Sequence, residues 1–97
     1  MVKVIAKNFI LPEHVSTAKS LFQELISATR QENGCIAYRL FLNTQDPSEY
    51  TFIEEWASQE ALDRHINTTH FQTLLPQIGQ LAAKPGEISV YTEFGAP

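Results

Sequence analysis

The chain has 97 residues, of which 43% are hydrophobic and 19% charged, as in an ordinary globular protein. This length predicts a single domain over residues 1–97, small enough to bury only part of its unfolded surface. No apolar run approaches the roughly 18 residues that a membrane span needs, so no membrane partner is expected. The formal net charge is −4 and the seven basic residues are scattered, which argues against nucleic-acid binding.

The N-terminal strand and the helix after it are predicted from apolar periodicity. Residues 2–10 alternate between two faces, as in a strand. Pro12 suits the first turn of a helix whose apolar residues recur at spacings of three and four over 15–29. Asn33 and Gly34 end this helix, and Gly34 is expected to adopt the left-handed conformation of a helix cap.

Two further strands follow and form a predicted hairpin. Residues 35–43 alternate, but they carry apolar side chains on both faces, which is typical of a sheet covered on both sides. Residues 43–48 are a turn signal. Aromatic and β-branched residues are concentrated in 50–56, and this segment is therefore expected to pair antiparallel with the strand before it.

The last third predicts a broken helix and a final strand. Ser58 is a natural N-cap for a helix over 59–66, and residues 67–69 interrupt it before a second stretch in which Thr69 and Gln72 could form a capping box. An apolar stripe then runs to Ala82, with Pro76 expected to kink the helix. The sequence Lys84–Gly86 ends that helix, and the alternation over 87–94 predicts a strand.

The order β-α-β-β-α-β predicts an α+β domain of the ferredoxin-like type. In this fold both helical segments cover one face of a four-stranded antiparallel sheet and leave the other face bare. The strands are apolar on both sides, and the bare face would be a larger apolar patch than monomers usually tolerate. A homodimer through the open sheet face is therefore expected.

Four motifs resemble, in this order and spacing, those of the antibiotic biosynthesis monooxygenase (ABM) family, which includes quinol monooxygenases. They are Glu32–Tyr38, Phe52–Trp56, Ala61–His65 and Thr69–Phe71. The resemblance implies a dimeric α+β barrel with a pocket between sheet and helices in each subunit. It also implies oxygenation of activated phenols or quinols without flavin, haem or metal, so no cofactor is expected.

Such a reaction needs a base, because an electron-rich quinol or polyphenol reacts with dioxygen once it is deprotonated. We predict His65 as the base. A phenol with a pKa near 10 and a histidine near 6.5 differ by about 3.5 units, or about 5 kcal/mol. Two charge-assisted hydrogen bonds to the anion, each contributing about 1.5 to 3 kcal/mol, could offset this difference, and the expected donors are Asn8, Tyr38 and Trp56.

Two of the candidate positions stand out by their neighbours on the strands. Asn8 alternates with apolar residues and must be hydrogen-bonded if it is buried. Glu54 shares a strand face with Phe52 and Trp56, which indicates an acid or base with a raised pKa or a partner that orients a histidine. The predicted catalytic residues are His65, Asn8 and Glu54, and the predicted substrate-binding residues are Tyr38, Trp56, His70, Phe71 and Phe52.

Structural roles remain alternatives for several of these residues. His65 could be a surface or capping histidine, His70 could fix the helix break, and Glu54 could form a salt bridge with Arg39 or Arg64. Packing in the core is the alternative for Tyr38 and Trp56. On one continuous helix, His65 and His70 would lie about 140° apart, so no metal site is predicted.

Three other functions compete with the monooxygenase. Haem degradation resembles this chain through Asn8, but the axial histidine of that branch falls near Leu75, so haem is not expected. An isomerase of a phosphorylated diketone needs a phosphate site, for which Arg39 and Arg64 are candidates. A dimer that only binds a small ligand is the non-enzymatic alternative.

The cellular compartment is inferred from the N-terminus and from cysteine usage. Apolar and charged residues alternate from Met1 to Lys7, unlike the continuous apolar stretch of a signal peptide. Cys35 is the only cysteine, which excludes an intrachain disulfide and suits a reducing compartment. The expected location is the cytoplasm.

Overall fold

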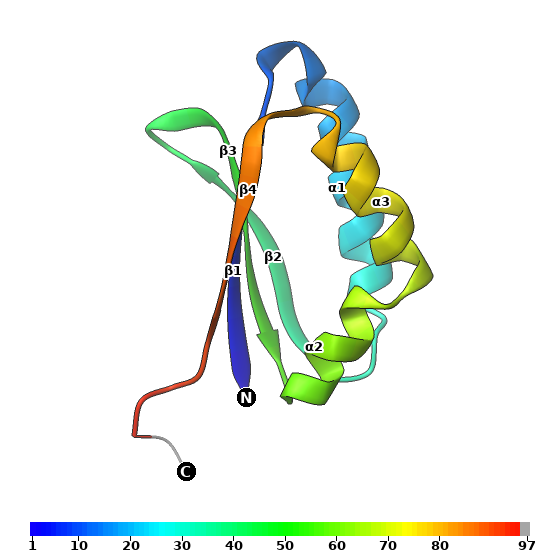
Figure 1. The fold of residues 1–97 in the computed structure, drawn as a ribbon, viewed down its shortest axis with the longest axis vertical. Helices are drawn as coiled ribbons and strands as arrows, with labels where there is room; N and C mark the ends of the chain where they lie inside the picture. The colour runs from blue at the N-terminus through cyan, green and yellow to red at the C-terminus, as the bar shows by residue number, and fades with distance from the viewer. Residues whose placement is uncertain (96–97) are drawn as a thin grey trace.

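The computed structural model describes residues 1–95; residues 96–97 of the predicted domain lie outside this range. Figure 1 shows the order of the elements. They are β1 (Val2–Ile10), a short 3-10 helix η1 (Pro12–His14), α1 (Val15–Thr29), β2 (Cys35–Asn43), β3 (Asp46–Trp56), α2 (Gln59–Ile66), α3 (Thr69–Gly79) and β4 (Ala82–Tyr91).

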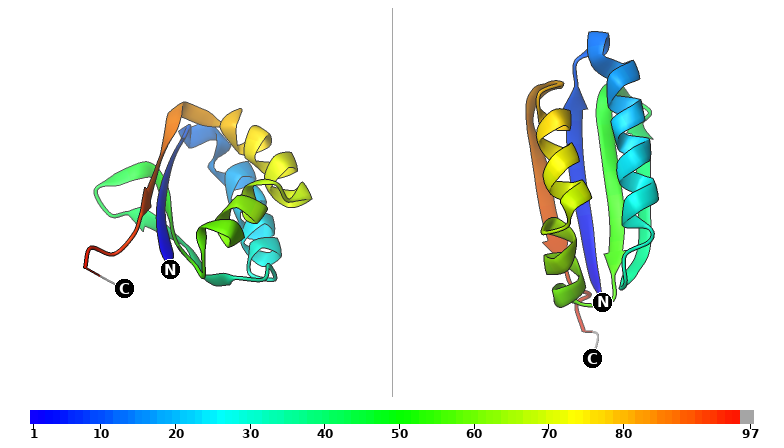
Figure 2. Two further views of the ribbon diagram at one scale, coloured as in Figure 1. Left: turned by 60° about the horizontal axis from the view of Figure 1, so that its bottom comes forward. Right: turned by 90° about the vertical axis from the view of Figure 1, so that its right-hand side faces the viewer.

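The four strands form one antiparallel sheet in the order β2-β3-β1-β4. All three α-helices lie on the same face of this sheet (Figure 2). This arrangement confirms the α+β ferredoxin-like fold that the element order predicts. No helix among the described residues is long and apolar enough to cross a membrane.

Gly34 connects the end of α1 to the start of β2 in a left-handed conformation, as the sequence predicts. Its φ is +91°, and a Cβ at this position would lie 2.6 Å from the Cβ of Ala61. The Ala57 N–H donates to the Gly34 carbonyl at 2.8 Å. Glycine is therefore required twice here, by the backbone angle and by the close approach of the loop to α2.

The break between α2 and α3 is built from side-chain caps. Ser58 Oγ accepts from the Ala61 N–H at 3.1 Å, which confirms the predicted cap of α2. Thr68 Oγ1 accepts from the Phe71 N–H at 3.3 Å, so α3 is capped one residue before the predicted capping box of Thr69 and Gln72. That prediction is wrong because Thr68 has the extended backbone of an N-cap.

The final strand begins earlier than the sequence predicts. The sequence predicts an apolar helical stripe to Ala82 and a strand over 87–94, but α3 ends at Gly79 and β4 spans Ala82–Tyr91. The Leu11 N–H donates to the Leu81 carbonyl at 3.0 Å, and this contact between distant segments starts the pairing with β1. Pro85 is tolerated because β4 is an edge strand, where a missing N–H breaks no second ladder.

The turn between β2 and β3 is also shorter than predicted. The sequence indicated a turn over 43–48 and a strand from Tyr50, whereas β3 begins at Asp46 and pairs there with Asn43. The side chain of Asp46 accepts from the Ser48 N–H at 3.0 Å and from its hydroxyl at 2.7 Å. These local bonds are compatible with extended backbone, so the turn signal did not exclude a strand.

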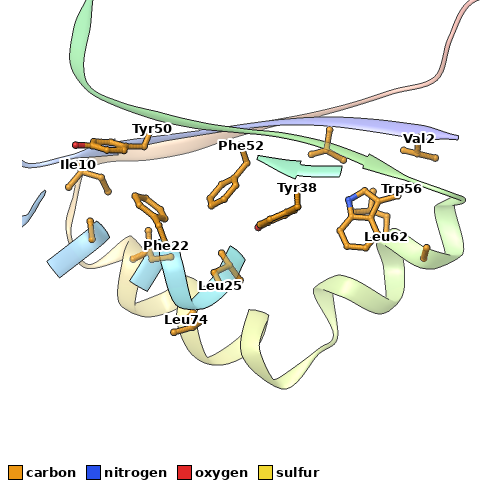
Figure 3. Close-up of a cluster of buried hydrophobic side chains, with 14 residues drawn as sticks. Val2, Ile10, Phe22, Leu25, Tyr38, Tyr50, Phe52, Trp56, Leu62 and Leu74 are labelled. Carbon is orange, nitrogen blue, oxygen red and sulfur yellow. The ribbon is translucent and has the colours of Figure 1, made fainter. Parts of the chain in front are cut away.

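Aromatic side chains form the centre of the core between α1 and the sheet (Figure 3). The Phe22 ring stacks on Tyr50 and meets Phe52 edge-on, each with a centroid distance of 5.6 Å. Tyr38 continues the row at 4.7 Å from Phe52. Trp56, with no exposed surface, ends the row beside α2. The aromatic row therefore links the main core to the end of the sheet that α2 covers.

Among residues 1–95, no helix lies over the opposite face of the sheet (Figure 2). Exposed apolar side chains on this face come from three strands, namely Phe41, Ile53 and Tyr91. Lys3 and Glu55 form a salt bridge of 3.3 Å across β1 and β3 on the same face. We call this side of the sheet the outer face.

Candidate active site

A cavity of about 510 Å³ lies between the helix-covered face of the sheet and α2 and α3. Its walls are mainly aliphatic and aromatic, with contributions from every strand of the sheet and from all three α-helices. Six of the eight predicted site residues line it: Asn8, Tyr38, Phe52, Glu54, His65 and Phe71. Trp56 and His70 are not in the wall, and each contacts a residue that is, as described below.

Glu54 is a buried carboxyl group, with 4% of its surface exposed. Its Oε1 accepts a hydrogen bond from the Trp56 indole Nε1 at 2.9 Å. The pKa of Glu54 is raised to about 7, mainly by burial; the Trp56 hydrogen bond opposes this shift and the negative charge of Glu32 adds to it. Near neutral pH this group can therefore either accept or release a proton.

The alternative role of Glu54, a salt bridge with Arg39 or Arg64, is wrong. Within residues 1–95, Glu54 has no ion pair, because it lies on the helix-covered face of β3 while Arg39 is opposite Ile53 on the outer face. Trp56 was predicted to donate to a substrate anion, but its single N–H is used by Glu54. Trp56 therefore influences the cavity through its hydrogen bond to the carboxyl group of Glu54, which lines the wall.

Tyr38 is opposite Glu54 in the register of β2 and β3 and is 3% exposed. Burial, followed by the charge of Glu54, raises the pKa of Tyr38 well above its ordinary value. Its hydroxyl is therefore protonated at all physiological pH values. It can donate a hydrogen bond into the cavity, and it cannot serve as a base there.

Asn8 lies where the pairing of β1 with β4 shifts register. Its Nδ2 donates to the Tyr50 carbonyl at 3.2 Å and makes a longer contact of 3.5 Å with the Ala6 carbonyl. The Asn8 N–H groups are thus directed to the backbone, contrary to the predicted role as a donor to a substrate anion. The amide oxygen has no partner among the described residues and is the atom that remains for a ligand.

His65 is buried, with 2% exposed, so the alternative of a surface histidine is wrong. Its ring packs against Trp56 with a centroid distance of 4.6 Å and meets Tyr38 and Phe71 edge-on at 5.5 and 5.0 Å. Burial lowers the pKa of His65, although the hydrogen bond and charge of Glu32 oppose this shift. The imidazole is therefore neutral at pH 7.

Glu32 joins the two histidines, and the sequence did not indicate it as a site residue. His65 Nδ1 and His70 Nε2 each lie 2.7 Å from the same Oε2 of Glu32. The predicted separation of about 140° assumed one continuous helix. The chain instead breaks at Asn67 and Thr68, so that the two rings approach to a centroid distance of 6.3 Å.

The same three side chains offer donor atoms of the kinds that divalent metals use. One carboxylate oxygen and two imidazole nitrogens lie within 4.8 Å of one another. Each nitrogen is at the distance of a charge-assisted hydrogen bond from the oxygen. Hydrogen bonds alone account for the arrangement, and it gives no reason to infer a metal ion.

The model of the antibiotic biosynthesis monooxygenase family matches residues 1–77. The chain belongs to this family. Rv0793 of Mycobacterium tuberculosis, which bears the name "Putative monooxygenase", is 33% identical over 92% of the chain and 87% of its own length. The uncharacterized protein sll1783 of Synechocystis is also 33% identical over 91% of the chain, which spans only 60% of that relative's length.

A solved structure agrees with the family assignment. A crystal structure described as an antibiotic biosynthesis monooxygenase superposes with a TM-score of 0.92 at 42% identity, covering 96% of this chain and 98% of that one. The family and the name of the Mycobacterium tuberculosis relative support a monooxygenase-like function. Neither names a substrate.

Proposed function

We propose that the chain is a cofactor-independent monooxygenase that oxidises a small aromatic quinol or polyphenol with dioxygen. The observation that carries this proposal is the cavity itself, whose mainly apolar wall contains a neutral histidine and a carboxyl group with a pKa near 7. Its volume of about 510 Å³ is within the usual range for a small-molecule site. Aromatic walls suit a flat aromatic substrate.

The chemistry begins with a proton transfer. His65 accepts the proton of a substrate hydroxyl at Nε2, and the resulting anion transfers an electron to dioxygen. The two radicals combine through a new carbon–oxygen bond, the peroxide regains a proton from His65, and loss of water leaves a hydroxylated quinone. A quinol and dioxygen thus give a hydroxyquinone and water, and the substrate supplies all the electrons.

Tyr38 and protonated Glu54 are the groups that would stabilise the substrate anion. Both are buried, both can donate an O–H, and they are neighbours across β2 and β3. An unperturbed histidine that deprotonates a phenol faces a cost of about 5 kcal/mol, and the lowered pKa of His65 increases this cost. Two charge-assisted hydrogen bonds, at about 1.5 to 3 kcal/mol each, offset most of it. These two residues take the place of the predicted Asn8 and Trp56 donors.

The competing enzymatic functions lack support at this cavity. Arg39 and Arg64, the candidate phosphate ligands of an isomerase, are both exposed and do not line it, and Lys7 is the only lysine or arginine among the described residues that does. Leu75, near the position of the axial histidine in the haem-degrading branch, lies in the cavity wall and cannot ligate iron.

The proposed enzyme is also a homodimer, formed through the outer face. Phe41, Ile53 and Tyr91 are 45%, 36% and 48% exposed on this face, which no helix covers. Burying them against a second copy would remove apolar surface from water at about 25 cal/mol per Å². Size-exclusion chromatography with light scattering should give twice the chain mass for the wild type and a monomer for Ile53→Lys. A monomeric wild type at micromolar concentration contradicts this proposal.

Oxygen consumption tests the enzymatic proposal directly. Hydroquinone, naphthoquinol and catechol substrates are compared for the wild type and His65→Ala, with His14→Ala, a histidine of η1 that does not line the cavity, as the control. We expect one substrate class to consume oxygen above background, with one atom of ¹⁸O₂ entering the product. Loss of the base should slow turnover about 10² to 10⁴-fold. Background consumption across the panel, with His65→Ala no different from the wild type, favours a protein that only binds a small ligand. Consumption that His65→Ala leaves unchanged refutes His65 as the base.

A further inference from the structure

We propose that Glu32 is a positioning residue that holds His65 with its proton on Nδ1 and its unprotonated Nε2 available to the cavity. The catalytic part of this inference rests on the proposed function, because it assigns a partner to the base of that reaction. The tautomer itself does not depend on any activity. Both parts follow from where the structure places one carboxylate oxygen.

The loop that contains Glu32 is fixed from two sides. Gly34 lies against α2, with its Cα close enough that an added Cβ would meet the Cβ of Ala61 at 2.6 Å. The hydrogen bond from the Ala57 N–H to the Gly34 carbonyl, 2.8 Å long, ties the same loop to the residue after β3. Glu32, two residues before Gly34, is thereby held next to the end of α2.

A count of protons identifies the tautomer. An ionised carboxylate only accepts hydrogen bonds, so each nitrogen at 2.7 Å from Oε2 of Glu32 must carry a hydrogen. For His65 this nitrogen is Nδ1. A neutral imidazole carries one N–H, and Nε2 of His65 therefore has a free lone pair. The ring lies in the cavity wall, where this lone pair can accept a proton.

Packing prevents the His65 imidazole from making a half turn about its Cβ–Cγ bond. The His65 ring lies against Trp56 at 4.6 Å and between the edges of Tyr38 and Phe71. A half turn of the ring would replace Nδ1 by a carbon and leave Glu32 without this donor. The aromatic contacts set the plane of the ring, and Glu32 selects which nitrogen carries the proton.

His70 holds the carboxylate in this position. Its Nε2 donates to the same Oε2, and Thr68, which caps α3 and donates to the His65 carbonyl at 2.7 Å, sets the distance between the two histidines. When the substrate O–H breaks, the new bond forms at Nε2 of His65. The Nδ1–H stays in place, and the resulting imidazolium is stabilised by the adjacent negative charge of Glu32.

The test combines a measurement on the resting protein with kinetics. Histidine ¹⁵N NMR of EDTA-treated protein reports which nitrogen of His65 carries the proton, and we expect Nδ1 in the wild type. In Glu32→Gln the amide can either donate or accept, so we expect mixed tautomers and a kcat about 10 to 100-fold lower, as for other residues that orient a histidine. The KM should change less than threefold, because Glu32 does not line the cavity.

Two further variants separate positioning from folding. Glu32→Asp keeps the charge and should recover part of the lost kcat, whereas Glu24→Gln removes an exposed carboxylate of α1 and should behave as the wild type. The kinetic pKa of the base should fall in Glu32→Gln and be unchanged in Glu24→Gln, since only Glu32 raises the pKa of His65.

Specific results overturn the inference. A wild-type His65 with its proton on Nε2 refutes the tautomer, whatever the activity. A folded Glu32→Gln protein with kcat within twofold of the wild type refutes the positioning role. If the wild type oxidises no member of the substrate panel, the proposed function fails, while the NMR measurement still decides the tautomer that Glu32 imposes.

Discussion

Replacing Glu54 by glutamine tests the electrostatics of the cavity most directly. Glutamine keeps an oxygen that can accept the Trp56 N–H, but it cannot ionise. The folded protein raises the pKa of Glu54 from 4.5 to about 7. A shift of this size corresponds to about 3 kcal/mol, at 1.36 kcal/mol per unit, between the protonated and ionised forms of a side chain that is almost fully buried.

The sign of the effect follows from proton linkage. Between pH 4.5 and about 7 the folded protein binds more protons at Glu54 than the unfolded chain does, so this group destabilises the protein as pH rises. The penalty is absent below pH 4.5 and is complete above about pH 7. The free energy of unfolding of Glu54→Gln, minus that of the wild type, should therefore increase by about 3 kcal/mol between pH 4 and pH 8.

Urea denaturation or thermal melts at pH 4, 5, 6, 7 and 8 measure this difference. At about 5 °C per kcal/mol for a domain of this size, the melting temperatures of the two proteins should diverge by roughly 15 °C across the range. Glu24→Gln is the matched control, since Glu24 is an exposed carboxylate of α1 that lines neither the cavity nor the outer face, and its free energy of unfolding should stay within about 0.5 kcal/mol of the wild type. A difference between Glu54→Gln and the wild type that is flat with pH would refute the raised pKa.

Two other substitutions test the structure around the site. Trp56→Phe removes the N–H that stabilises the ionised form of Glu54, so the pKa of Glu54 should rise above 7. ¹³C-carboxyl NMR measures this pKa, and an unchanged or lower value would contradict the hydrogen bond. Gly34→Ala places a Cβ at 2.6 Å from that of Ala61, at a residue whose φ is +91°. Chemical denaturation should show that the free energy of unfolding falls by about 1 to 3 kcal/mol. A fall of less than about 0.5 kcal/mol would show that the loop adapts.

Strand periodicity predicted four of the residues that the sheet supplies to the cavity, namely Asn8, Tyr38, Phe52 and Glu54. Side chains of a strand alternate between two faces, so Tyr38, Phe52 and Glu54 were fixed on a common face once the pairing of β2 and β3 was known. Asn8 was placed correctly for the same reason, although its N–H groups bond to backbone carbonyls. The neighbours of a side chain decide which of its atoms have no hydrogen-bond partner, and periodicity does not specify these neighbours.

The residues supplied by helix ends and loops could not be predicted in this way. The position of Glu32 depends on the close approach of Gly34 to Ala61, a contact between segments far apart in the chain. The position of His70 depends on the angle at which α3 leaves the Thr68 cap. The sequence did contain a signal, since an acidic residue before a cap glycine and two histidines on either side of a helix break were all visible.

The two carboxyl groups of the site have different environments, and one of them influences the other. Glu32 is partly exposed and accepts two hydrogen bonds, from His65 and His70, whereas Glu54 is buried and has a single donor, Trp56. The negative charge of Glu32 raises the pKa of His65 and also raises that of Glu54. The negative charge of Glu32, which lies outside the cavity, therefore favours the protonated forms of both His65 and Glu54. This is the state that follows proton transfer from a substrate, when His65 is an imidazolium and Glu54 must still donate a hydrogen bond to the anion.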